Sequence, residues 1–141
     1  MSSQPITVRV QHRYSQSAER VFDAWLDVDK AKRFFFATPQ GTPVRAEMEA
    51  RVGGEFVFVD RRGDEDAEHV GRFLVIERPR RLVFEFAVGT PRSPYTRVTI
   101  DIEPLGDGCQ VTLTHEGVPE EWAKQSEGGW STMLAAVEKV A

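Results

Sequence analysis

Apolar and polar residues alternate along most of this chain with the period of two that is typical of β-strands. From Pro5 to Tyr14, the residues Ile6, Val8, Val10, His12 and Tyr14 share one side, and polar residues lie between them. The same alternation returns in six later segments, which are 44–52, 55–60, 68–77, 82–88, 98–102 and 111–115. Glycine, proline or charged turns separate these segments, so the pattern predicts hairpins of an antiparallel sheet with one face in water.

Three other segments have the spacing of amphipathic helices. Ser17 is expected to cap a first short helix that carries Val21, Phe22 and Trp25 on one side. A second short helix is expected from Asp29 to Phe35. The last and longest runs from Pro119 to Ala141, with Pro119 at its first position. Its predicted inner arc comprises Trp122, Ser126, Gly129, Trp130, Met133, Ala136, Val137 and Val140.

The order of the predicted elements defines a fold class. One strand, two short helices, a run of six strands and a final helix indicate an α+β protein rather than one with alternating strands and helices. A strongly curved antiparallel sheet could wrap around the apolar face of the last helix. With 141 residues, the chain is expected to form a single domain over residues 1–141.

Composition narrows the classes of function. The net charge of −4 argues against nucleic-acid binding. The apolar runs are too short to span a bilayer, and the N-terminus lacks the features of a signal peptide, so no membrane insertion is expected. A lone cysteine, Cys109, allows no internal disulfide and is consistent with a cytoplasmic location.

Several short fragments follow one another in a characteristic order. They are Val21-Phe22-Asp23-Ala24-Trp25, Arg33-Phe34-Phe35, Gly53-Gly54-Glu55-Phe56, Gly71-Arg72-Phe73, the run from Pro79 to Phe84, the run from Thr112 to Gly117, and the run from Gly129 to Leu134. Together they resemble the START-like (SRPBCC, or Bet v 1-like) superfamily, whose architecture is the helix-grip fold. Within it, the chain is most similar to bacterial homologues of the heat-shock-protein ATPase activators, the Aha-type family. Val28 and Ala31 depart from residues that this family favours.

The resemblance implies a cavity between the sheet and the last helix, and it implies no shared catalytic motif. The chain contains nine Phe, three Trp and two Tyr, most of them at inward-facing positions. Core packing accounts for many of these rings, but the implied cavity favours some as ligand contacts. The predicted ligand-binding residues are Trp25, Phe35, Phe56, Phe58, Phe73, Phe84, Phe86, Trp130 and Met133, with Tyr95, Arg97 and His115 as polar anchors. The expected ligand is a small hydrophobic or amphipathic molecule.

The histidines and glycines give more specific expectations. His12 and His115 lie on the inward side of their strands, whereas His69, beside the charged turn 61–66, is expected to be solvated. We predict no catalytic residue, no metal and no cofactor, because no ligand set or acid–base pair has a suitable spacing. Gly128 is expected to face solvent, and Gly129 to pack closely against a strand.

Two alternatives to ligand binding stay open. The chain could be a protein-interaction module in the stress response, similar in role to the heat-shock ATPase activators. It could also be a cyclase- or hydrolase-type enzyme that uses the same cavity. Whether the protein is a monomer or a homodimer is open as well.

Overall fold

The protein forms one seven-stranded antiparallel sheet that carries its helices on one face. The computed structural model describes residues 5–89 and 92–141, and the strand order within them is β1-β7-β6-β5-β4-β3-β2. The strands are β1 Pro5–Tyr14, β2 Thr42–Met48, β3 Glu55–Arg62, β4 Glu65–Glu77, β5 Arg81–Val88, β6 Thr96–Leu105 and β7 Gly108–Pro119. All neighbours except β1 and β7 are consecutive in the chain, which is the hairpin arrangement that the alternating pattern predicts.

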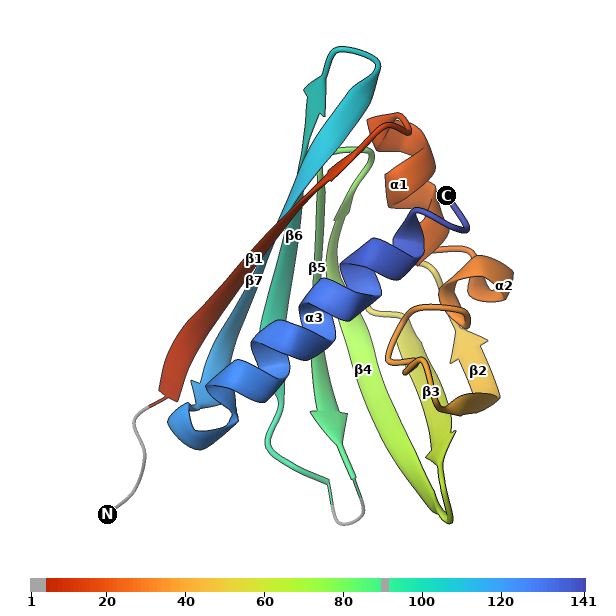
Figure 1. Cartoon of the computed structure of the whole chain (residues 1–141), viewed down its shortest axis with the longest axis vertical. Helices are drawn as coiled ribbons and strands as arrows, with labels where there is room; N and C mark the ends of the chain where they lie inside the picture. The colour runs from red at the N-terminus through yellow and green to blue at the C-terminus, as the bar shows by residue number, and fades with distance from the viewer. Residues whose placement is uncertain (1–4, 90–91) are drawn as a thin grey trace.

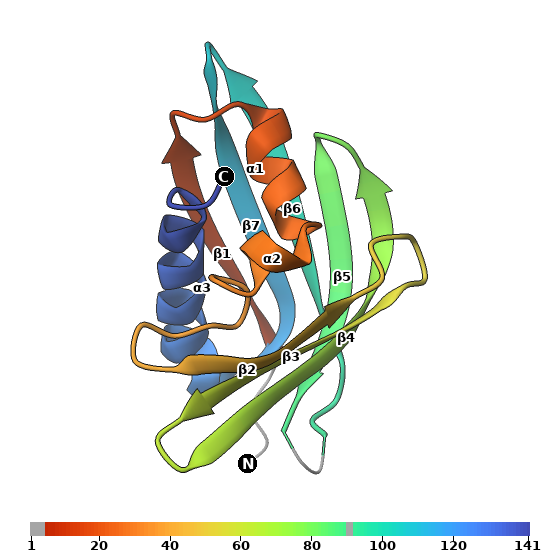
Figure 2. The same ribbon diagram turned by 90° about the vertical axis from the view of Figure 1, so that its right-hand side faces the viewer.

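The helices cover the concave face of the curved sheet. Helix α1 spans Ala18–Trp25 and helix α2 spans Val28–Ala31, whereas α3, Ala123–Val137, crosses the sheet obliquely (Figure 1). The view from the side shows all three helices on the same side of β1, β7 and β6, with β2 and β3 curling around below α2 (Figure 2). The predicted α+β helix-grip fold is therefore confirmed.

The C-terminal end of α3 and the residues after it are held by polar contacts. The hydroxyl of Tyr14, on β1, donates a buried hydrogen bond of 2.7 Å to the carbonyl of Leu134 in the last turn of α3. From α1, the guanidinium of Arg20 donates to the backbone carbonyl of Ala141. These contacts fix the C-terminal half of α3 against the sheet and α1.

Local sequence signals place the first two elements correctly. The observed bounds of β1 match the alternating segment, and the side chain of Ser17 accepts a hydrogen bond of 3.3 Å from the backbone N–H of Arg20, as expected of a helix cap. The second helix is shorter than the expected 29–35. It gives way to turns that end at Phe36, a non-glycine residue with a positive φ of 56°.

The last helix begins later than the sequence predicts. Pro119 is the final residue of β7, and a 3-10 helix, η1 Glu120–Trp122, precedes α3. Because Trp122 lies in this tighter turn, it leaves the inner arc of α3 and its exposed fraction is 52%. The buried residues of α3 are Trp130, Leu134 and Val137, so Leu134 is a core position that the predicted arc omits.

The strand at residues 44–52 also differs from its prediction. β2 ends at Met48, and Val44 and Val52 are exposed. β2 is an edge strand that pairs with β3 alone, and its register shifts between Pro43 and Arg45. β1 is an edge strand as well, but α3 packs over it and buries its inner face, whereas β2 lies next to the short helix α2. Alternation in β2 therefore does not produce a fully covered face.

The core consists of a dense cluster of rings beneath α1 and α2. The ring centroid of Phe35 lies 5.3 Å from that of Trp25, 4.9 Å from that of Phe58 and 5.2 Å from that of Phe84. These side chains are almost completely buried. No helix within the described ranges is both long and apolar enough to cross a membrane.

Candidate ligand-binding site

A cavity of about 530 Å³ lies between the first half of α3 and one end of the sheet. The wall is formed by the end of β3, the start of β4, the end of β5, the start of β6 and the end of β7. Its main apolar residues are Phe36, Phe86, Val118, Trp130 and Met133. Its main polar residues are Arg62, His69, Thr96, His115, Gln125 and Ser126. The cavity therefore lies at the end of the sheet that α1 and α2 leave uncovered.

Phe36 is the central ring of the cavity wall. Its centroid lies 4.2 Å from that of His69, with the two ring planes inclined by only 10°, and 4.8 Å from that of Phe86. Trp130 approaches it from α3 at 5.8 Å. The same residue stacks on Phe35 at 4.4 Å, so Phe36 separates the packed core from the cavity.

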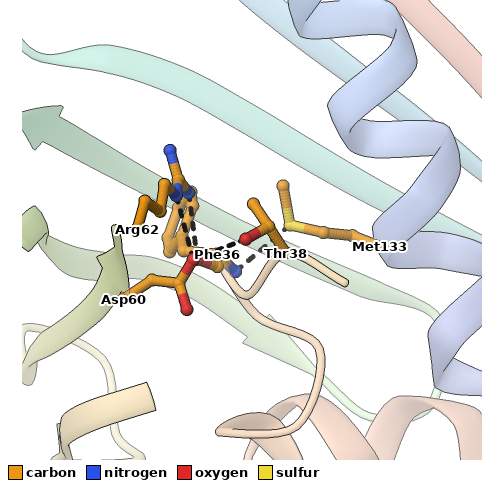
Figure 3. A network of polar contacts seen from close by, with 5 residues as sticks. All are labelled: Phe36, Thr38, Asp60, Arg62 and Met133. Carbon is orange, nitrogen blue, oxygen red and sulfur yellow. Dashed lines mark hydrogen bonds and ion pairs between the residues drawn. The ribbon is translucent and has the colours of Figure 1, made fainter. Parts of the chain in front are cut away.

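Polar contacts from two sides hold Phe36 in its left-handed backbone conformation (Figure 3). Its backbone N–H lies 3.2 Å from the sulfur of Met133 on α3, and its carbonyl accepts from Arg62 on β3 at 3.4 Å. Arg62 also donates to the carboxylate of Asp60 at 2.9 Å, and Thr38 donates to the same oxygen at 2.8 Å. A left-handed conformation is unfavourable for a residue with a Cβ atom. These contacts supply the restraint that keeps Phe36 there.

His115 lies in the cavity wall with both ring nitrogens already hydrogen-bonded. The indole N–H of Trp130 donates to Nδ1 of His115 at 3.0 Å, and Nε2 of His115 lies 2.7 Å from the hydroxyl of Thr96. Burial lowers the pKa of His115 to about 4, so its ring is neutral at pH 7. A ring whose lone pair is occupied and whose pKa is low is poorly suited to act as a general base.

His69 is buried, and the expectation that it would be solvated is wrong. It lies on the inward side of β4 together with Gly71 and Phe73, two and four residues away, and its exposed fraction is 6%. Burial, reinforced by the nearby charge of Arg62, lowers the pKa of His69 to about 4. Its Nδ1 atom is buried and makes no hydrogen bond within the described part of the chain. The ring stacks on Phe36 and lies at an angle to Phe86.

His12 faces inward as predicted but lies away from the cavity. Its Nε2 atom contacts the carboxylate of Glu138 at 2.6 Å, near the C-terminal end of α3. The side chain therefore helps to fasten β1 to the helix. It is not part of the cavity wall.

The structure divides the twelve predicted ligand-binding residues into three groups. Four line the cavity, namely Phe86, His115, Trp130 and Met133. Six are packed in the core beneath α1 and α2 and do not line it, namely Trp25, Phe35, Phe56, Phe58, Phe73 and Phe84. Tyr95 and Arg97 are exposed and do not line it either.

The prediction overlooked Phe36, Arg62, His69 and Thr96 as wall residues. Thr96 could have been predicted from the sequence. In β6 it lies two and four residues before Val98 and Ile100, whose side chains are buried, so it shares their face of the strand. Arg97 is adjacent to Thr96 in the strand and therefore points to the other face. The same rule places His69 with Phe73. A periodic pattern does not predict the position of Phe36, because this residue lies at the end of a turn.

Gly129 also differs from its expectation. A Cβ atom built at Gly129 would have no neighbour within 4 Å, and the residue lines the cavity, so the predicted close strand packing is wrong. Gly128 likewise has open space around it but does not line the cavity. The two adjacent glycines thus differ in the surface that they face.

The charged turn between β3 and β4 contains an ion pair. Arg61 donates to Asp66 across the β3–β4 turn at 2.9 Å, as expected of a solvated hairpin tip. Within the part of the chain that the structure describes, no three His, Cys, Asp or Glu side chains come together in a way that could hold a metal ion.

The curved sheet, the crossing helix and the cavity between them define a helix-grip protein of the kind that typically carries a ligand-binding cavity. Residues 15–141 match the family described as "Activator of Hsp90 ATPase homolog 1-like protein". The chain belongs to this family, which confirms the resemblance drawn from the spaced fragments.

Solved bacterial structures share the fold over nearly the whole chain. The Mll3558 protein from Rhizobium loti has 26% sequence identity and a TM-score of 0.83, with 100% of both chains covered. Protein CV1439 from Chromobacterium violaceum has 22% identity and a TM-score of 0.82, with 94% of each chain covered. Protein SA2116 from Staphylococcus aureus has 17% identity and a TM-score of 0.84, with 98% of this chain and 94% of that chain covered. At such identities the last two are similar in fold alone. None of the curated proteins matches the chain.

Proposed function

We propose that the protein binds a small hydrophobic or amphipathic molecule in the cavity between the sheet and α3. The observation that carries this proposal is the cavity itself, about 530 Å³ in volume and walled by Phe36, Phe86 and Trp130. This volume lies within the range of small-molecule sites, which are mostly apolar with a few placed polar groups. The paired histidine–threonine contact and Arg62 are such polar groups.

The distribution of exposed apolar side chains supports an entrance at the same place. Val88 is 37% exposed and Trp122 is 52% exposed, and both line the cavity. An apolar rim next to polar residues such as Gln125 suits a ligand with one apolar and one polar end. The protein would then shield the apolar part of that ligand from water.

The enzyme alternative has less support from the described residues. His115 uses its lone pair to accept from Trp130, and His69 is a neutral ring stacked on Phe36. Neither residue is joined to a carboxylate that could orient it as a base. The protein-interaction alternative rests on the family description, and the binding test below separates it from ligand binding.

A pair of adjacent substitutions tests the proposal. Gly129→Leu places a side chain in the cavity, whereas Gly128→Leu places the same side chain outside it. Both changes replace a helical glycine, so both should raise the free energy of unfolding by about 0.5–1 kcal/mol. Only Gly129→Leu should interfere with a bound molecule.

The measurement uses Nile red, an uncharged apolar dye whose emission depends on its surroundings. We expect the unmodified protein to bind the dye near one to one with a blue-shifted emission. Gly129→Leu should weaken binding by roughly five- to a hundredfold, because steric overlap of this kind costs about 1–3 kcal/mol. Gly128→Leu should bind as the unmodified protein does. Equal binding by both variants, or no binding by the unmodified protein, would contradict the proposal and favour a protein partner.

A further inference from the structure

The direction of the hydrogen bonds through His115 is fixed by the chemistry of Trp130. An indole N–H can only donate, so Nδ1 of His115 must accept and carries no proton. A neutral imidazole then has its proton on Nε2. That N–H lies 2.7 Å from Oγ1 of Thr96 and donates to it.

This direction leaves the hydroxyl proton of Thr96 available. Thr96 accepts from His115, and its own O–H makes no other hydrogen bond within the described residues. Thr96 lines the cavity at the start of β6, next to Phe86, with which it pairs across β5 and β6. A hydroxyl donor therefore faces a cavity whose nearest walls are aromatic rings.

The remaining polar groups of the wall bear on the charge of a bound molecule. Arg62 is the charged side chain among the described cavity residues; its Nε donates to the buried carboxylate of Asp60 at 2.9 Å, and 43% of its side chain remains exposed to water. The rings of His69 and His115 are neutral at pH 7. Because the pair with Asp60 already neutralises Arg62, an ionised group buried deeper, beside the neutral rings, would leave water without an unpaired counter-charge, which is unfavourable. A neutral imidazole has one donor and one acceptor, so His69 does not decide between ligands.

We propose that Thr96 donates a hydrogen bond to a carbonyl oxygen of the ligand, and that the ligand is an uncharged apolar ring compound bearing that carbonyl. This inference rests on the proposed function, since it specifies the ligand class of the same cavity. Trp130 and His115 act as positioning residues, because they fix the proton of Thr96 without contacting the carbonyl themselves.

The test compares two fluorescent probes that differ by one group. The first is propionyl-dimethylaminonaphthalene, an uncharged aromatic ketone, and the second is its propyl analogue, in which CH2 replaces the carbonyl. We expect the unmodified protein to bind the ketone more tightly than the analogue by roughly three- to tenfold, the usual contribution of one hydrogen bond. Thr96→Val, which keeps the shape of the side chain, should lose the preference for the ketone. Thr96→Ser, which restores a hydroxyl, should recover the preference.

The outcomes separate the two proposals. If both probes bind the unmodified protein equally, or if Thr96→Val keeps the preference for the ketone, the role of Thr96 is overturned and ligand binding stands. If neither probe binds although Nile red does, this inference is overturned and the proposed function stands; if Nile red does not bind either, both fail. A Thr96→Val variant that loses affinity for both probes in the same proportion indicates a structural role only, and also overturns the inference.

A second measurement tests the hydrogen-bond direction without any ligand. Nitrogen NMR of the imidazole groups distinguishes the two neutral tautomers of histidine. We expect the ring of His115 to carry its proton on Nε2 at pH 7. A proton on Nδ1 would overturn the inference.

Discussion

The two histidines in the cavity wall should make the stability of the protein depend on pH. His69 and His115 each have a pKa of about 4 in the folded protein, compared with 6.5 for a histidine in water. The unfolded chain therefore binds protons below pH 6.5 that the folded protein does not accept until about pH 4. The stabilisation is complete above pH 6.5 and is lost as the pH falls from 6.5 towards 4.

The size of this effect follows from the two pKa values. At 1.36 kcal/mol per pH unit, going from pH 7 to pH 4.5 should lower the free energy of unfolding by about 2.5 kcal/mol for each histidine. The two together amount to about 5 kcal/mol, a large part of the total stability of a typical domain. Exposed carboxylates such as Asp23 and Asp66 have pKa values lowered by Arg78 and Arg61, so they act mainly at a lower pH.

Urea titrations at pH 7, 5.5 and 4.5 would measure this dependence. His115→Gln is a suitable control, because the amide can accept from Trp130 and donate to Thr96 but does not titrate in this range. It should remove about half of the pH dependence, and the double variant with His69→Gln should remove nearly all of it. A free energy of unfolding that differs by less than about 1 kcal/mol between pH 7 and pH 4.5 in the unmodified protein would refute the reasoning. So would a double variant that is as sensitive to pH as the unmodified protein.

Two further changes test the packing of the fold. Tyr14→Phe removes the donor to the carbonyl of Leu134 and should lower the free energy of unfolding by about 1–2 kcal/mol, measured by denaturant titration at pH 7; an unchanged value would contradict the assigned contact. Gly71→Ala would place a Cβ atom 2.2 Å from a ring carbon of Phe56 and 2.4 Å from the carbonyl of Glu85, so it should lower the melting temperature by several degrees or more. Unchanged melting in Gly71→Ala would mean that β4 and β5 can separate at this point without cost.

The alternating pattern predicted the buried faces best in strands that are covered by other parts of the molecule. The alternation in β1, β5, β6 and β7 identified the buried faces because these strands pack against neighbours on both sides or under α3. It was less informative at β2, which α3 does not cover and where Val44 is exposed. Alternation reports which residues share a face, whereas burial of that face depends on what covers it.

The cavity residues were harder to predict because packed and unpacked rings look the same in a sequence. Phe84 and Phe86 are two residues apart on one strand and face the same side, yet Phe84 lies in the packed core and Phe86 lines the cavity. What separates them is the reach of α1 and α2, which is a tertiary property. Thr96 and His69 could have been predicted from the alternation of their strands. Phe36 could not, because it is a left-handed residue at the end of a turn.

The position of Phe36 explains how one set of rings can serve both stability and binding. Its ring stacks on Phe35 in the core and on His69 in the cavity wall, so it ends the packed region at a defined point along the sheet. Beyond it, α3 alone covers the strands, and Gly129 leaves room beneath the helix. Residues on the far side of Phe36 can therefore change the shape and polarity of the cavity without entering the core. Under the proposed function, Thr96 and Gly129 would set what binds, whereas Phe35 and its neighbours would keep the fold.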